Sequence, residues 1–223
     1  MHYDPRSEPH GLAFDPFKAL VAPRPIGWIG TIGPDGVPNL APYSFFNAVS
    51  DKPPFVLFSS VGRKDSQANI EANGEFTCSF ASWELREQMN MSSAPVATGI
   101  DEFDLAKLPI AASTHIAPPR VAGSPAALEC RLWKTIELPG NPRRPDQPGN
   151  TVIIGEVVAI YIDDAYIRDG RFDTAGARPI ARMGYMDYAV VTPETCFELN
   201  RPTVSPDGRS AAVEAGPWDG VYR

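Results

Sequence analysis

The sequence contains few cysteines and histidines, and they are scattered along the chain. Three cysteines and three histidines occur in 223 residues. Cys78, Cys130 and Cys196 are odd in number and form no CxxC spacing, which favours reduced thiols in a cytoplasmic compartment over a disulfide framework. We interpret each as a small buried apolar residue. No HExxH motif or paired Cys/His spacing offers zinc enough ligands, so we expect no metal site.

Long apolar segments and an excess of positive charge are also absent. The longest apolar stretch, residues 152–162, contains Glu156 and is far shorter than the about 20 residues that span a bilayer. The first residues lack the basic and apolar regions of a secretory signal, so we expect a cytoplasmic protein with no membrane segment. Lys and Arg number 20 against 27 Asp and Glu, giving a net charge of −7, which argues against general nucleic-acid binding. An anionic ligand would therefore need a local basic site.

Two common catalytic motifs are missing. The chain has no G-x-S-x-G elbow of a serine hydrolase and no GxxxxGK[ST] phosphate loop. Gly27, Gly30 and Gly33 recur at every third residue, which differs from the G-x-G-x-x-G of a dinucleotide-binding fold. We interpret these glycines as positions of tight strand packing.

Short β-rich runs separated by turn-forming residues dominate the sequence. Residues 33–36 predict a hairpin turn, and Gly74 predicts the end of a helix that Asp65 or Ser66 would cap. We expect strands over residues 25–32, 39–50, 55–60, 75–81, 127–138 and 151–163, with shorter ones near 166 and within 181–191. We expect helices over residues 65–72 and 83–90, the second capped by Ser82, and a helical turn near 103.

This pattern predicts a mainly β protein, an antiparallel β-barrel with a few short helices. The two long runs, residues 127–138 and 151–163, are expected to pair antiparallel. We assign residues 1–200 to one domain and residues 201–223 to a polar, turn-rich C-terminal tail. That tail either wraps a partner subunit or hangs free.

An ordered series of motifs connects the chain to a known family. The most informative block is residues 24–80, and the likeness extends over about residues 15–195. Its pieces are Arg24-Pro25, the DGxPN turn at 35–39, YSFFNxVS at 43–50, Arg63-Lys64-Asp65-Ser66, Glu102-Phe103, LEC at 128–130 and VIIGEV at 152–157. In this order the chain resembles the flavin reductase-like family of FMN-binding split barrels, which includes flavoredoxin.

The resemblance implies an antiparallel split β-barrel that forms a homodimer, with FMN sites near the subunit interface. It implies an NAD(P)H-dependent flavin reductase, in which NADH or NADPH reduces FMN, with a flavin-dependent oxygenase or a redox protein as a further partner. Because the flavin itself accepts the electrons, no catalytic side chain is expected. One alternative is a flavoredoxin-like electron carrier reduced by a protein donor, and another is a β-barrel binding module without flavin.

A small basic cluster is the expected phosphate site. Arg63, Lys64 and Ser66 precede or begin the expected helix, where unpaired N–H groups and the helix dipole favour an anion. FMN carries nearly two negative charges on its phosphate, and a protein of net charge −7 must meet them locally. Without the resemblance, an ordinary solvated loop would be the simpler interpretation.

The resemblance also implies which residues line the isoalloxazine ring and the ribityl chain: Thr31, Ser44, Phe45, Phe46, Asn47 and Ser60. Consecutive side chains on a strand point to opposite faces, so at most one of Phe45 and Phe46 is expected to face the flavin.

Three further positions are open. Trp28 either stacks near the flavin or lies in the core. Arg182 resembles a family position near the cofactor, with a surface salt bridge as the alternative. Many short members of the family carry a histidine where this chain has Asn150, so the help that an imidazole gives to nicotinamide binding is in doubt here.

Overall fold

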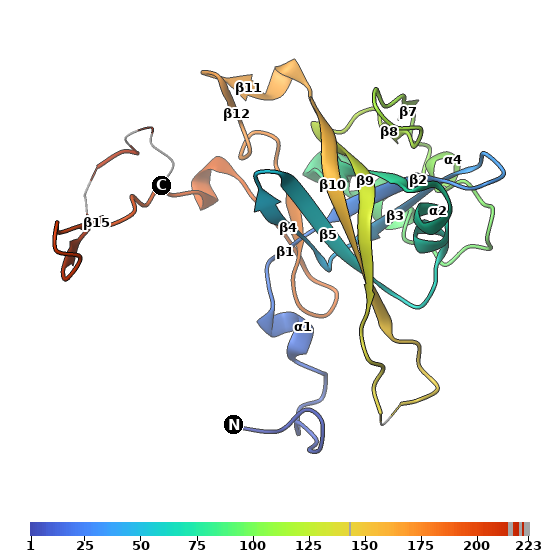
Figure 1. The fold of residues 1–223 in the computed structure, drawn as a ribbon, viewed down its shortest axis with the longest axis horizontal. Helices are drawn as coiled ribbons and strands as arrows, with labels where there is room; N and C mark the ends of the chain where they lie inside the picture. Colours follow the sequence, from blue (N-terminus) through green and yellow to red (C-terminus); the bar gives the residue numbers. More distant parts are fainter. Residues whose placement is uncertain (143, 214–215, 219, 221–223) are drawn as a thin grey trace.

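The main body of the protein is a seven-stranded antiparallel sheet rolled into an open barrel (Figure 1). The computed structural model describes residues 1–142, 144–213, 216–218 and 220. The strands of the barrel are β2 (Gly27–Ile32), β3 (Pro38–Tyr43), β4 (Phe46–Asp51), β5 (Pro54–Val61), β6 (Glu75–Phe80), β9 (Ala126–Glu137) and β10 (Asn150–Ile162). They are ordered β3-β2-β6-β9-β10-β5-β4. The predicted fold class, a split β-barrel with few helices, is therefore confirmed.

Small elements surround this sheet. The helices are α1 (Phe17–Leu20), α2 (Asp65–Asn73), α3 (Arg86–Met91), α4 (Glu102–Leu105) and the 3-10 turns at Trp83–Leu85, Asp164–Tyr166 and Pro193–Thr195. The minor strands are β1 (Arg24–Pro25), β7 (Ile110–Ala111), β8 (Arg120–Val121), β11 (Ile167–Arg168), β12 (Arg171–Phe172), β13 (Ile180–Arg182), β14 (Tyr188–Val190), β15 (Thr203–Val204) and β16 (Ala211–Ala212). Among the described residues, no helix is both long and apolar enough to cross a membrane.

Several sequence-based predictions need correction. The expected strand over 39–50 is two strands, β3 and β4, interrupted at Ser44 and Phe45. The expected helix over 83–90 is a 3-10 turn followed by α3, and Ser82 makes no side-chain capping bond. The short strand expected near residue 166 is present as β11, directly after a 3-10 turn that ends at Tyr166, whereas the single strand expected within 181–191 is the β13–β14 hairpin. Cys78 and Cys130 are buried as expected, but Cys196 is exposed, because the segment after β14 leaves the barrel (Figure 1).

The barrel is split between its two edge strands. β3 pairs with β2 and β4 pairs with β5, and no ladder joins β3 to β4. Only Ser44 and Phe45 connect the end of β3 with the start of β4, so the chain crosses from one edge of the sheet to the other in two residues. The Phe45 carbonyl accepts a hydrogen bond from the Ser59 N–H at 2.8 Å, whereas the Ser44 N–H and carbonyl and the Phe45 N–H form no backbone bond with the described residues and are available to a ligand.

Strand β2 is buried on both of its faces. Ile29 packs inside the barrel with Phe58, Phe76 and Ile153, whereas Trp28 packs on the outer face in a second cluster that includes Phe103. The glycines of β2 permit this close packing. A Cβ on Gly27 would lie 2.5 Å from the Phe46 ring, and one on Gly30 would collide with Thr77 and lie 2.7 Å from the Pro119 carbonyl oxygen. The expectation of tight strand packing is confirmed at these positions.

Candidate functional site

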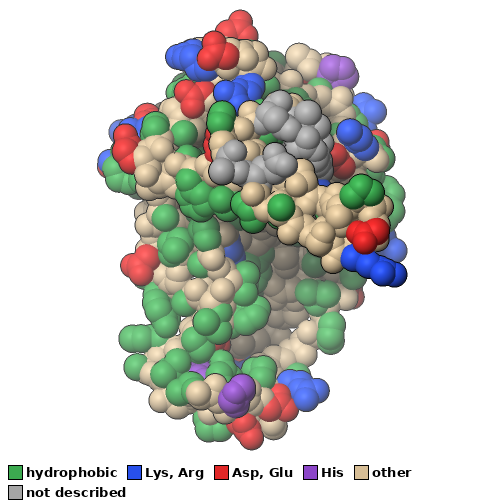
Figure 2. Space-filling model, turned by 90° about the vertical axis from the view of Figure 1, so that its left-hand side faces the viewer, with side chains coloured by type: hydrophobic (Ala, Val, Ile, Leu, Met, Phe, Trp, Pro, Cys, Tyr) green, Lys and Arg blue, Asp and Glu red, His purple; other side chains and the backbone are tan. Residues whose placement is uncertain are grey.

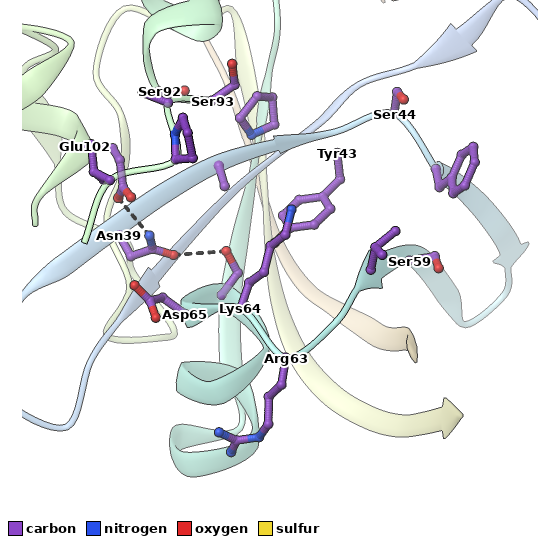
Figure 3. Close-up of a pocket in the computed structure, with 18 of the residues that line it drawn as sticks. Asn39, Tyr43, Ser44, Ser59, Arg63, Lys64, Asp65, Ser92, Ser93 and Glu102 are labelled. Carbon is purple, nitrogen blue, oxygen red and sulfur yellow. Dashed lines mark hydrogen bonds between the residues drawn. The ribbon is translucent and has the colours of Figure 1, made fainter. Parts of the chain in front are cut away.

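A cavity of about 560 Å³ opens at the split in the barrel. Its walls come from the end of β3, the Ser44–Phe45 link, the end of β5, the turn at residues 63–66, residues 92–98 and Glu102 (Figure 3). These segments are distant in sequence, and the topology of the sheet brings them together. The cavity is lined by hydroxyl, amide and charged groups as well as apolar side chains.

Five of the eleven residues predicted to bind the cofactor line this cavity: Ser44, Phe45, Arg63, Lys64 and Ser66. Phe45 and Phe46 point to different sides as expected, although Phe45 lies in the link before β4 and not on a strand. Phe45 faces the cavity, whereas Phe46 packs against the barrel core and borders a separate apolar cavity of about 260 Å³.

The other predicted residues lie outside the cavity lining. Thr31 and Ser60 are fully buried behind its wall, and Ser60 donates a hydrogen bond to the Gly62 carbonyl at 3.2 Å. Trp28 is also fully buried, and its indole N–H donates to Ser92 Oγ at 2.9 Å. Of the two interpretations of Trp28, the structure therefore places its ring in the core.

Asn47 and Arg182 lie away from the cavity. Asn47 is exposed on β4, and its Oδ1 accepts a hydrogen bond from the N–H of Ala48. Arg182 stacks over the ring of Tyr188 at 4.5 Å and donates to the carbonyl of Tyr185. No ion pair joins Arg182 to a carboxylate among the described residues, so the alternative of a surface salt bridge is wrong.

The two cations of the predicted phosphate site point in different directions (Figure 3). The Arg63 guanidinium turns away from the other cavity residues and pairs with Glu71 on α2 at 2.9 Å. The Lys64 side chain runs into the cavity toward Tyr43, and it forms no ion pair with any described residue. Of these two residues, Lys64 is therefore the one whose charge the cavity offers to an anionic ligand; Lys18 of α1 also lines the cavity.

The start of α2 adds backbone N–H donors beside Lys64 at the cavity. The N-cap residue of α2 is Lys64, and no side chain caps the helix. The prediction that Asp65 or Ser66 caps it is wrong, because Asp65 instead accepts a bond from Thr98 Oγ1 at 3.0 Å and Ser66 donates to Asn39 Oδ1 at 2.9 Å. The first N–H groups of a helix have no partners within it, so they can bind an anion.

The hydroxyl of Tyr43 is an unsatisfied polar group at this site. The side chain is only 7% exposed, and its oxygen forms no hydrogen bond within the described structure. Burial raises the pKa of this phenol, and the neighbouring hydroxyls of Ser66 and Ser60 offset that effect only in part. An unpaired buried hydroxyl costs free energy, and a ligand with a polar atom at this place would satisfy it. The sequence-based site omitted Tyr43, although it begins the YSFFN run.

A buried polar network begins in the cavity wall and continues behind it, and sequence reasoning also missed it. Asn39 Nδ2 donates to Glu102 Oε2 at 2.7 Å, and its Oδ1 accepts from Ser66 and from Thr31 Oγ1, the latter at 3.2 Å. Asn69 completes the network with a 3.1 Å bond to Thr31 Oγ1. Asn39 and Glu102 belonged to motifs of the resemblance, but no local pattern indicates that they meet.

Asn150, where many short members carry a histidine, lies beside the cavity. It is the first residue of β10, opposite Val61, and its Nδ2 donates to Ser59 Oγ at 3.1 Å. Ser59 lines the cavity, so Asn150 contributes to that wall through a neighbour.

The comparisons with known proteins agree with this arrangement. Residues 20–176 match the flavin reductase like domain. An uncharacterized protein of Deinococcus radiodurans is 36% identical over 214 residues, covering 91% of this chain and 90% of that protein. The chain belongs to the flavin reductase-like family, which supports a flavin-binding function of the reductase type.

Two solved structures have the same fold. Nitrilotriacetate monooxygenase component B from Bacillus cereus superposes with a TM-score of 0.81 at 28% identity, over 89% of this chain and 98% of that one. The 2-nitrobenzoate 2-nitroreductase NbaA of Pseudomonas fluorescens gives a TM-score of 0.78 at 26% identity, over 92% and 98%. Both likenesses extend over nearly the whole barrel.

The unpaired hydroxyl leads to a prediction about stability. The variant Tyr43→Phe should leave the free energy of unfolding of the ligand-free protein unchanged or raise it by up to about 1 kcal/mol, because it removes an unsatisfied polar group. Urea denaturation measures this change. As a control, Ser92→Ala removes the partner of the Trp28 N–H and should lower stability by about 1–3 kcal/mol. A comparable loss in Tyr43→Phe would show that the phenol has a partner in the free protein.

Proposed function

We propose that this protein binds FMN in the cavity at the split and reduces it with NADH or NADPH. The observation that carries the proposal is the convergence of Lys64, the uncapped start of α2 and the unpaired Tyr43 hydroxyl on one cavity. A flavin phosphate matches this donor set, because it needs positive charge and several N–H or O–H donors. The residues present therefore fit the cofactor.

In this proposal the protein binds and orients the reactants. Lys64 and the first turn of α2 would hold the phosphate, the Tyr43 hydroxyl would bond to a polar atom of the ligand, and the backbone of Ser44 and Phe45 would border the ring. When bound, FMN accepts a hydride from the nicotinamide C4, and a proton from solvent completes its reduction. No acid, base or nucleophile of the protein is required. Membership of the family and the likeness to NbaA, which is named as a nitroreductase, support this redox role.

Asn150 favours a second candidate, an electron carrier of the flavoredoxin kind. Its amide is bonded to Ser59, so the wall offers a neutral amide where an imidazole would otherwise help to hold a nicotinamide. In this alternative the same cavity binds FMN, but a redox protein supplies the electrons.

The first test measures flavin binding and reduction together. Purified protein mixed with FMN and NADH or NADPH should oxidise the nucleotide in a flavin-dependent reaction, followed by its loss of absorbance. A protein that binds FMN, is not reduced by either nucleotide and accepts electrons from a ferredoxin-type donor would be the carrier instead. A protein that binds no flavin on titration would be a binding module of another kind.

The second test separates the two basic residues. Lys64→Met should weaken FMN binding by about tenfold or more, since one charge-assisted bond to the phosphate is lost. Arg63→Met should weaken it by less than about threefold, because Arg63 is exposed and paired with Glu71. Fluorescence titration measures both. Riboflavin lacks the phosphate, so its affinity should be the same in all three proteins, and an equal loss for both ligands would contradict a phosphate role for Lys64.

We also propose that two copies of the chain associate. The reduced flavin would pass its electrons to a flavin-dependent oxygenase or a redox protein. We expect this reaction to take place in the cytoplasm. Figure 2 shows a hollow face between the N-terminal and C-terminal segments, with hydrophobic side chains along its walls. Phe197 and Leu199, beyond the barrel, are each 81% exposed, and α1 exposes Phe17 and Leu20. Contiguous exposed apolar surface is typical of an interface, and we infer that these side chains contribute to one. The name of the Bacillus cereus structure, a monooxygenase component, supports the oxygenase partner.

Association has its own test. Light scattering coupled to gel filtration should give twice the mass of one chain, and the double variant Phe197→Asp and Leu199→Asp should shift the population toward single chains, because a charge is costly in an apolar interface. An unshifted dimer would place the interface elsewhere, and a wild-type protein that elutes as one chain would contradict the proposal.

A further inference from the structure

Glu102 is a buried carboxylate in the cavity wall, and its side chain accepts hydrogen bonds from two residues of β3. The residue is 6% exposed, and its Oε2 accepts a bond from the Leu40 N–H at 3.0 Å and from Asn39 Nδ2 at 2.7 Å. It begins α4, which Asp101 caps through the N–H of Phe103. Burying a carboxylate costs free energy unless hydrogen bonds compensate it. The groups that donate to Glu102 are therefore the ones whose positions depend on it.

The contact with Glu102 fixes the orientation of the Asn39 amide. An ionised carboxylate only accepts hydrogen bonds, so the NH2 group of Asn39 must face it. The carbonyl oxygen of Asn39 then faces away from Glu102, where it accepts from the hydroxyls of Ser66 and Thr31. Figure 3 shows the bond between Asn39 and Glu102. A reversed amide would bring its oxygen to 2.7 Å from a carboxylate oxygen, with no hydrogen between them. Glu102 therefore determines how Asn39 holds Ser66 at the cavity.

A second buried glutamate provides a contrast. Glu129 is 3% exposed and lies outside the cavity lining. Burial would raise its pKa, but bonds from the N–H groups of Thr114 and His115 outweigh burial and bring the pKa below its usual value. Burial raises the pKa of Glu102, and the bonds from Leu40 and Asn39 do not cancel that effect, to which nearby Asp65 adds. Hydrogen bonds thus compensate the cost of burial less fully at Glu102 than at Glu129, and of the two only Glu102 lines the cavity.

We propose that Glu102 is a positioning residue of the flavin site, which acts through Asn39 to hold the Ser66 hydroxyl where the ligand meets it. This inference rests on the proposed function, because it assumes that flavin occupies the cavity. The residue makes no step of the reaction itself. Glu102 and Asn39 also line the cavity, so the test must show that the effect of Glu102 on binding passes through Ser66.

The test compares three variants by fluorescence titration with FMN. Glu102→Leu should weaken binding by about tenfold, because Asn39 loses the acceptor that orients it. Ser66→Ala should weaken it by a similar factor. If Glu102 acts through Ser66, the double variant should bind no more than about twofold more weakly than Ser66→Ala alone. Glu102→Gln should recover most of the affinity, since its side-chain oxygen can accept the same two bonds.

Matched controls separate positioning from general stability. Glu129→Leu removes a carboxylate of similar burial and should lower the melting temperature while leaving the FMN affinity of the folded protein unchanged. If Glu102→Leu does not fold, Asn39→Ala interrupts the same link from its other end and should show the same non-additivity with Ser66→Ala.

Three outcomes would overturn the inference: the effects of Glu102→Leu and Ser66→Ala multiply, Glu102→Gln binds as weakly as Glu102→Leu, or the folded Glu102→Leu protein keeps full affinity. Failure of the proposed function looks different, because the wild-type protein would then bind neither FMN nor riboflavin.

Discussion

The opening between β3 and β4 is the constraint on which the rest of this molecule depends. A sheet that closed into a full barrel would use its edge groups in pairing, but here the chain passes from one edge to the other through Ser44 and Phe45 alone. Because the edges are not paired, a polar cavity can form between them without breaking a ladder. The start of α2 and the segment around residues 92–98 then close the cavity from outside the sheet.

Local charge at this cavity matters more than the charge of the whole protein. The chain has a net charge of −7, and Asp65 and Glu102 both lie at the cavity. Both carboxylates accept bonds from neighbouring groups, Asp65 from Thr98 and Glu102 from Leu40 and Asn39. Lys64 has no such partner among the described residues, so its charge and the N–H groups of α2 face the cavity. An acidic protein can in this way offer a cationic site.

Sequence reasoning succeeded where a property belongs to a short segment. The glycine spacing correctly indicated close packing of β2, and Phe45 and Phe46 face different sides as expected, although Phe45 precedes β4 and is not part of a strand. Sequence reasoning failed where more than one partner lies within reach of a side chain. Arg63 and Lys64 are adjacent and look equivalent in sequence, but Arg63 reaches Glu71 on the outer side of α2, and nothing in the local pattern distinguishes the two.

The sequence by itself determined the class of fold, the family and the segment that contains the basic cluster, because these follow from strand periodicity, turn residues and the order of motifs. Only the tertiary structure decided which groups meet. Glu102 lies 63 positions from Asn39, and the Tyr43 hydroxyl is buried without a hydrogen-bond partner among the described residues. Contacts between distant segments depend on the register and curvature of the sheet, and the pattern of one short segment does not predict these contacts.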